Sequence, residues 1–288
     1  MKIPDNTKIQ SIDLTVKDLE SSLNFYNKLL GFKIIEKKSN TAYLSSNGNY
    51  PYLISLEENK SANPLNRHAA GLYHTAFRFP DRKSLALEFL HLHENNTKFH
   101  GFSDHIVSEA IYLGDPDGNG VELYVDKPRS EWVWKLGQVQ MDTLPLNLHV
   151  LTNELDNRDE KWTGINPGVD IGHIHLRVTD LFKAEKFYSN LLGFNITTSN
   201  YPGALFISAG GYHHHIGANI WSSNNGPAMK ENSLGLKSFT INIPDANFVD
   251  EIKTNSIKNG LEFSELRNGA QGISLKDYDN ISVKLSTV

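Results

Sequence analysis

The chain has 288 residues, of which 39% are hydrophobic and 21% are charged, and its 28 basic and 33 acidic side chains leave a net charge of −5. This composition is typical of a globular protein with a substantial core, and it argues against a wholly disordered chain. A mild acidic excess disfavours a broad surface for nucleic acid or anionic membrane, so we expect no nucleic-acid partner. The absence of cysteine excludes disulfides, thiolate metal sites and cysteine nucleophiles.

Neither a secretory signal nor a membrane span is expected. The first residues lack an apolar h-region, and no stretch approaches about 18 consecutive apolar residues. We therefore expect a cytoplasmic protein without membrane contact, and a homo-oligomer is left open. Histidine is abundant, with 12 copies, three of which are consecutive at 213–215. Because cysteine is absent, any metal site must use histidine and carboxylate ligands.

A long internal repeat organises the chain. Residues 12–32 and 174–194 are identical at 11 of 21 positions with an offset of 162, and further matches follow in nearly the same frame. We predict two copies, at 8–126 and 170–286, joined by a linker at 127–169.

Each copy divides again into two halves with the same order of elements. Apolar alternation predicts strands, and helical spacing between an aspartate N-cap and a glycine stop predicts helices. The first half of copy one is predicted as a strand at 12–16, a helix from Asp18 to Gly31, and strands within 33–56. The second half is predicted as a strand at 73–79, a helix near 82–95, and strands near 99–113 and 120–125. The chain therefore holds four βαβββ modules, numbered one to four along the sequence.

This pattern resembles the vicinal-oxygen-chelate superfamily, which includes glyoxalase I, fosfomycin-resistance enzymes, bleomycin-binding proteins and extradiol dioxygenases. The resemblance rests on IHLRVTDLFKAEKFYSNLLGF, on its copy in module one, and on DPDGNGVELY at 115–124. It implies an α+β fold with two glyoxalase-like domains, at 8–126 and 170–286, built on curved and mostly antiparallel sheets. The segment GGYHHHIGANIW at 210–221, together with IGHIHLRV, is most similar to the bacterial two-domain catechol 2,3-dioxygenase group.

The two copies carry complementary sets of metal-ligand candidates. Strand alternation, with a further strand expected at His213–Gly217, predicts one set of side chains facing a cavity: His74, Glu122, Tyr124, His173, His175, His213 and His215. Matching by the repeat frame pairs the four candidates with non-ligands in the other copy: His74 with Ser238, Glu122 with Lys284, His173 with Ser11, and His215 with Leu53. A lysine ammonium beside a divalent cation would be strongly repelled. We therefore expect one metal site, shared by modules two and three across the two copies.

The resemblance suggests what this site would hold. In extradiol dioxygenases two histidines and a glutamate at these motif positions bind Fe(II), which implies His173, His74 and Glu122 here and leaves coordination positions open for substrate and O₂. His215 occupies the place of a fourth ligand in glyoxalase-type proteins. With four ligands the site would suit Zn²⁺, Ni²⁺ or Mn²⁺.

Further residues are candidates for catalysis and substrate binding. Predicted cavity-facing positions and nearness in sequence point to four acid/base candidates, namely His175, His213, Tyr124 and Tyr212. Arg78 and Arg177 are candidates for an anionic substrate group. The favoured function is an extradiol dioxygenase of aromatic catabolism that acts on a catechol-like compound with O₂. The alternatives are a glyoxalase-type metal-dependent isomerase or thiol transferase, and a non-catalytic small-molecule (drug) binding protein.

Overall fold

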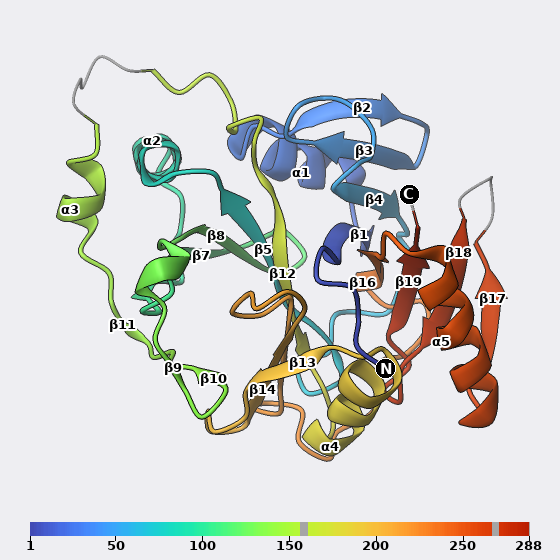
Figure 1. Ribbon diagram of the computed structural model, residues 1–288. Helices are drawn as coiled ribbons and strands as arrows, with labels where there is room; N and C mark the ends of the chain where they lie inside the picture. Colours follow the sequence, from blue (N-terminus) through green and yellow to red (C-terminus); the bar gives the residue numbers. More distant parts are fainter. Residues whose placement is uncertain (156–160, 267–270, 288) are drawn as a thin grey trace.

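The computed structural model describes residues 1–155, 161–266 and 271–287 of the chain. Residues 156–160, within the predicted linker, lie outside the described residues. Figure 1 shows two β-sheets side by side, with helices against their outer faces. Apolar side chains from both sheets form one continuous core, in which strand β1 lies against strand β12.

The first sheet, called the site sheet below, has nine strands in the order β11-β6-β7-β8-β5-β12-β15-β14-β13. Their bounds are β5 (Gly71–Phe79), β6 (Gly101–Asp104), β7 (Ser108–Gly114), β8 (Gly120–Asp126), β11 (Leu144–Pro145), β12 (Asp170–Arg177), β13 (Asn195–Thr198), β14 (Ala204–Ser208) and β15 (Ile216–Asn219). It combines modules two and three, which meet where β5 pairs antiparallel with β12.

The second sheet, called the counterpart sheet, has eight strands in the order β17-β18-β19-β16-β1-β4-β3-β2. Their bounds are β1 (Lys8–Val16), β2 (Lys33–Lys37), β3 (Thr41–Ser45), β4 (Ile54–Glu58), β16 (Gly235–Asn242), β17 (Phe263–Glu265), β18 (Gly272–Lys276) and β19 (Ser282–Ser286). It combines modules one and four. Each sheet therefore takes one module from each sequence copy, and the pairing of modules two and three agrees with the expectation from the ligand pattern.

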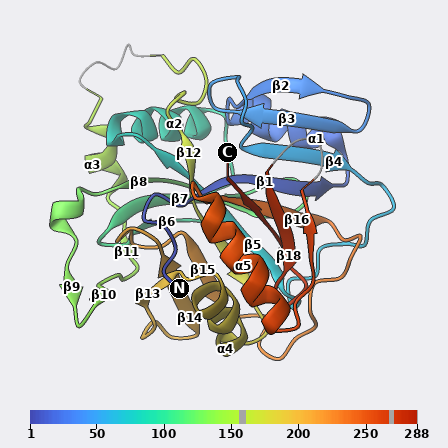
Figure 2. The same ribbon diagram turned by 45° about the vertical axis from the view of Figure 1, so that its right-hand side comes forward.

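The remaining elements are helices and a short hairpin of β9 (Trp134–Lys135) and β10 (Gln138–Val139). The helices are α1 (Leu19–Leu23), η1 (Asn24–Leu29), α2 (Arg82–Glu94), η2 (Arg129–Glu131), α3 (Leu148–Thr152), α4 (Leu181–Ala184), η3 (Glu185–Leu191) and α5 (Ala246–Lys258). Figure 2 shows α5 and α4 on the near side of the sheets. Among the described residues, no helix has the length and apolar character that crossing a membrane would require.

The helix predicted between Asp18 and Gly31 differs from a regular α-helix. After one α-helical turn it widens to a π-helix, in which the Leu30 N–H donates to the Phe25 carbonyl at 2.9 Å. The wider turn buries both Phe25 and Tyr26. A hydrophobic pattern alone does not distinguish the two kinds of turn.

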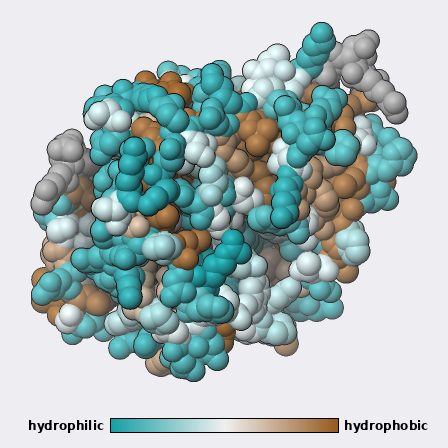
Figure 3. All heavy atoms as spheres, turned by 180° about the vertical axis from the view of Figure 1, so that it is seen from behind, coloured by the Kyte–Doolittle hydropathy of each residue, from teal (hydrophilic) through white to brown (hydrophobic). Residues whose placement is uncertain are grey.

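The molecular surface is mixed in character. Seen from behind, hydrophilic residues cover most of the face, with apolar residues between them (Figure 3). Such a distribution is ordinary for a folded domain, because polar side chains cannot cover the whole surface.

Candidate metal centre

Three side chains from adjacent strands of the site sheet converge on one point. His74 lies on β5, Glu122 on β8 and His173 on β12, and β5 runs between the other two strands. The Glu122 Oε2 atom is 2.9 Å from His74 Nε2 and 3.2 Å from His173 Nε2. Their candidate ligand atoms all lie within 4.8 Å of one another, and all three residues are buried. The structure thus brings together three of the four residues predicted as ligands.

Local backbone irregularities aim these side chains. The pairing of β12 with β5 skips Gly172 on one strand and Tyr73 on the other, which places a β-bulge beside each histidine. A Cβ atom at Gly172 would lie 1.7 Å from the Tyr124 hydroxyl. Only glycine therefore fits beside His173 without displacing its neighbours.

Burial sets the charge of the cluster. It lowers the pKa of His173 to about 4, although Glu122 opposes this shift, so the imidazole is neutral at pH 7. For Glu122 burial acts in the opposite direction, but the facing rings of His173 and His74 outweigh it and hold the carboxyl pKa well below its usual value. The cluster therefore offers one carboxylate and two imidazoles that can each supply a lone pair.

This donor set fits a divalent metal ion. The Nε2 atoms of His74 and His173 both face the same oxygen of Glu122, at 2.9 Å and 3.2 Å. Buried nitrogen and carboxylate ligands that converge in this way can bind one cation together. Two imidazoles and a carboxylate on one side of an ion leave the other side open, which is the arrangement typical of non-haem Fe(II) sites.

The cluster opens into a cavity of about 730 Å³. Its lining includes, besides the cluster, the side chains of Arg67, Tyr73, Tyr112, Asp142, His175, Arg177, Phe206, His214 and Trp221. The volume falls within the range of small-molecule sites, and aromatic groups with a few polar ones are the usual lining.

Tyr112 and His214 are two of several cavity residues that the sequence did not identify. Tyr112 lies opposite Glu122 on β7, and its hydroxyl contacts His105 Nε2 at 2.7 Å. The ring of His214 lies 4.1 Å from that of His173. Tyr112 could have been predicted as the residue that pairs with Glu122 across two neighbouring strands and so shares its face. His214 lies outside any strand, so alternation does not predict its orientation.

The predicted orientation of the histidine run is wrong. Residues 213–215 were expected to start a strand with His213 and His215 facing the cavity, but β15 begins only at Ile216 and His214 lines the cavity instead. The Nδ1 atom of His215 contacts the Ser208 hydroxyl at 2.8 Å and accepts from the Ala209 N–H at 3.2 Å. His215 does not belong to the ligand cluster found among the described residues.

The four acid/base candidates occupy two different places. His175 lines the cavity, and its ring is 4.9 Å from that of His74. The other three lie behind the cluster in a buried network, in which the Tyr124 and Tyr212 hydroxyls are 2.6 Å apart and Asp126 accepts from Tyr212. His213 Nε2 is 2.8 Å from the same Asp126 carboxylate. Of the four, only His175 can meet a bound molecule directly.

The two arginines predicted to bind an anionic substrate group lie in different places. Arg78 does not line the cavity, and its guanidinium donates to Asp170 at 2.8 Å and 3.1 Å and to Asp126 at 3.3 Å. It thus braces the strands rather than facing a substrate. Arg177 does line the cavity, as predicted from its place on the face that carries His173 and His175.

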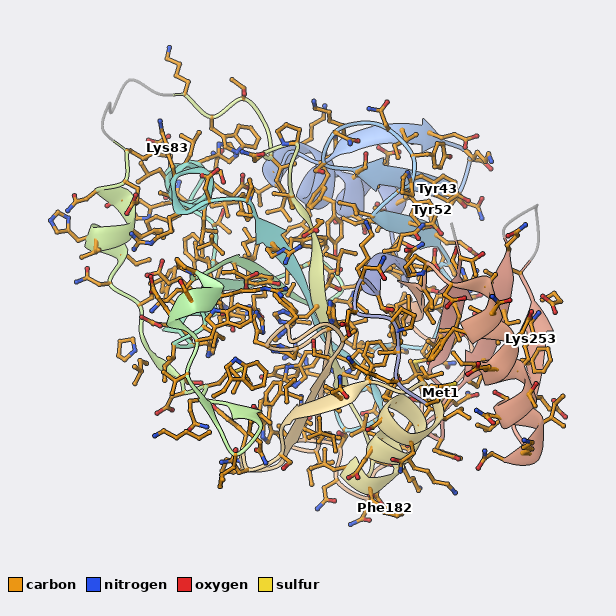
Figure 4. The ribbon with its side chains drawn as sticks, viewed as in Figure 1. Met1, Tyr43, Tyr52, Lys83, Phe182 and Lys253 are labelled. Atoms are coloured by element: carbon orange, nitrogen blue, oxygen red, sulfur yellow. The ribbon has the colours of Figure 1, made fainter. Side chains whose placement is uncertain are left out.

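The counterpart sheet carries an internal ion pair at the matching position. Lys284, which replaces Glu122 in the repeat, donates to Asp13 Oδ2 at 2.7 Å, and Ser238, which replaces His74, donates to the same oxygen at 2.6 Å. Tyr52 donates to Asp13 Oδ1 at 2.9 Å. Figure 4 labels Tyr52 beside Tyr43 in this sheet. An ammonium group thus occupies the region that corresponds to the cluster.

Two sheets of this kind, each built from two modules, with ligand candidates on the paired first strands β5 and β12 and on β8, define a glyoxalase-like protein. The sequence profile of the Glyoxalase/Bleomycin resistance protein/Dioxygenase superfamily matches residues 8–123 and 170–265. The chain belongs to this superfamily.

Individual relatives agree with this placement. The chain is 43% identical over 270 residues to a catechol-2,3-dioxygenase of Bacillus subtilis, an alignment that covers 92% of this chain and 93% of the relative. Among solved structures, a Bacillus subtilis protein assigned as a dioxygenase has a TM-score of 0.68 at 14% identity, covering 99% of this chain and 86% of that one. Glyoxalase I from Zea mays has a TM-score of 0.59 at 16% identity, covering 98% and 92%. The structural likenesses show the shared fold, and the first relative shows close kinship.

Proposed function

We propose that this protein is a metal-dependent extradiol dioxygenase that opens the ring of a catechol-like aromatic with O₂. The observation that carries the proposal is the cluster of His74, Glu122 and His173 at the wall of a cavity. Kinship with a protein named catechol-2,3-dioxygenase supports the same reaction class. The cluster provides three ligands on one side, as a site that must also admit a diol and O₂ requires.

In this proposal His74, Glu122 and His173 hold Fe(II). When bound, the iron would supply a path for electron density from the diol to O₂. Aromatic side chains that line the cavity around the cluster give the ring of the substrate an apolar surface to contact. The protein also positions the diol, since β5, β8 and β12 fix the three ligands on hydrogen-bonded strands.

His175 is the proposed acid/base. Burial, with smaller contributions from His74 and His173, lowers the pKa of His175 well below its usual value, so its ring is neutral at pH 7. Its Nε2 atom is buried without a hydrogen-bond partner among the described residues. The placement of this unpartnered nitrogen in the cavity beside the metal ligands suits proton transfer with the substrate hydroxyl.

The test is metal content together with ring opening. The protein is loaded anaerobically with Fe(II), mixed with a panel of catechols, and followed by O₂ uptake and by the absorbance of the ring-opened product. We expect one iron per chain and activity in the wild type and in H215A, and loss of both in H74A and H173A. Intact catechols across the panel in the iron-loaded protein would contradict the proposal. Oxygen-independent activity with Ni²⁺, Zn²⁺ or Mn²⁺ would favour an isomerase or transferase instead.

A further inference from the structure

Arg177 is a buried cation that faces the cavity. It is 5% exposed and ends strand β12. Its Nε–H donates to the Ala69 carbonyl at 3.2 Å, and no carboxylate of the described residues is among the groups that influence its charge. Burial and the neighbouring Arg67 lower the pKa of Arg177 to about 10, which leaves it charged at neutral pH. A buried charge without a counter-ion is costly, so this position requires an explanation.

Arg78, on the neighbouring strand, is a useful comparison. Its guanidinium binds two carboxylates, those of Asp170 and Asp126, and it does not line the cavity. An arginine whose role is to brace the sheet is therefore supplied with its own acidic partners. Arg177 has Arg67 as its charged neighbour instead, at the rim of the cavity. Two guanidinium groups at one end of a cavity attract an anion.

The position of Arg177 along β12 places a cationic group at the opposite end of the cavity from the metal ligands. His173, His175 and Arg177 share one face of the strand, and alternate residues of a strand are about 7 Å apart. Between the metal ligands and Arg177, the His175 ring lies 5.1 Å from Tyr73 and 5.5 Å from Trp221. The cavity thus runs from a metal-binding end, past an aromatic wall, to a cationic end.

Two carboxylates also line the cavity, but neither neutralises the cationic end. Glu122 belongs to the ligand cluster. Asp142 lies on the wall formed with His105, whose Nδ1 contacts the Asp142 carbonyl at 2.8 Å. The electrostatic neighbours that influence Arg177 are Arg67 and Tyr73. The counter-ion at this end must therefore come from a bound molecule.

We propose that the substrate is a catechol whose side chain ends in a carboxylate, and that Arg177, with Arg67 at the rim, binds this carboxylate. The inference rests on the proposed dioxygenase function and specifies its substrate class. The diol lies at the cluster, the ring lies along the wall of His175, Tyr73 and Trp221, and the acidic group meets the guanidinium. Binding supplies the anion that the buried arginine lacks, so affinity depends on the charge of the side chain.

A matched pair of substrates tests this inference. One is 3-(3,4-dihydroxyphenyl)propanoate and the other is its primary amide, which has nearly the same shape without the charge. For the wild type we expect kcat/KM to favour the acid by about 10- to 100-fold, through KM, as a charge-assisted hydrogen bond would give. In R177M this ratio should fall to near one, and R177K should recover part of it. The exposed R129M variant, outside the cavity, should keep the wild-type ratio.

A binding measurement separates this inference from the proposed function. 3-Phenylpropanoate lacks the diol, so its binding to the purified protein by calorimetry does not need a metal. We expect it to bind at least 10-fold more tightly than its amide, and R177M to remove the difference. Equal binding of acid and amide, together with equal kcat/KM for the two catechols, would overturn the inference while leaving the dioxygenase proposal standing. Preferential binding of the acid without opening of any catechol would do the reverse.

Discussion

At the scale of single residues, the site depends on a glycine that carries no chemistry. Gly172 lies next to His173, and its missing side chain leaves room for the Tyr124 hydroxyl. Tyr124 is fully buried and is held by Tyr212, so it cannot easily move aside. A methyl group at this position must displace either the tyrosine or the strand that carries the metal ligand.

We therefore expect G172A to weaken metal binding by about 10-fold or more and to lower the free energy of unfolding by about 1–3 kcal/mol, as overpacking of a core does. The measurements are a metal titration and thermal unfolding. G101A is the matched control, because nothing lies within 4 Å of a Cβ placed at Gly101. Metal binding equal to that of the wild type in both variants would show that Gly172 does not position His173.

How far the sequence predicted the site also depends on particular residues. The repeat identified His74, Glu122 and His173, because each has a non-ligand at the same position of the other copy, namely Ser238, Lys284 and Ser11. The orientation of residues 213–215 could not be predicted in this way. Alternation applies only inside a strand, and β15 begins just after this run.

At the scale of elements, helix α2 and the end of the linker are joined by a buried carboxyl group. Trp162 Nε1 donates to Glu88 Oε2 at 2.7 Å, while Glu88 Oε1 has no partner among the described residues. The ring of Trp162 also stacks on His91 with the centroids 3.5 Å apart. Burial raises the pKa of Glu88 to about 8, so the group is protonated in the folded protein at neutral pH.

This shift predicts a pH dependence of stability. Because the folded state holds the Glu88 proton more tightly than the unfolded state, Glu88 contributes its full stabilisation below about pH 4.5 and loses it as the pH rises toward 8. Each pKa unit corresponds to about 1.4 kcal/mol. We expect E88Q, which keeps the acceptor for Trp162, to lose less stability than the wild type between pH 5 and 8 in urea unfolding. E94Q, on an exposed residue of the same helix, should keep the wild-type slope, and equal slopes in all three proteins would refute the assignment.

The sequence predicts the strands and helices better than it predicts the register in which the strands pair. The sequence predicted most strands and helices, including α2, because each has its own periodicity and cap. It did not show the bulges at Tyr73 and Gly172, which skip single residues in the pairing of β5 with β12. A bulge depends on the partner strand, and the sequence of one strand does not record its partner.

At the scale of the whole molecule, the two sheets are joined by two equivalent hydrogen bonds, one within each sequence copy. Tyr26 of module one donates to Asp115 of module two, and Tyr188 of module three donates to Asp277 of module four. Each hydrogen bond links a helix of one sheet to a loop of the other, because the two modules of a copy belong to different sheets. The duplication thus accounts for the pairing of modules in each sheet and for the two equivalent hydrogen bonds that join the sheets.

Because of the duplication, each position of the site sheet has an equivalent position in the counterpart sheet, and the residues at the two positions can be compared. His175 pairs with His74 in the site sheet, and Asp13 pairs with Ser238 at the matching register of the counterpart sheet. The ligand residues of one sheet are replaced in the other by a polar cluster with its own ammonium group on Lys284. We infer that this cluster stabilises the fold without binding metal.

The variant K284M tests this separation of roles. It leaves the Asp13 carboxylate, whose side chain is 10% exposed, with hydroxyl partners only, so we expect unfolding to cost about 1–3 kcal/mol less. Metal content should stay at one ion per chain, and ring opening should keep its wild-type rate. K237M removes an exposed pair with Glu57 on the same sheet and should change stability by less than about 1 kcal/mol. A fall in metal content in K284M, with K237M unaffected, would mean that the two clusters are coupled through the shared core, and the separation of roles would be wrong.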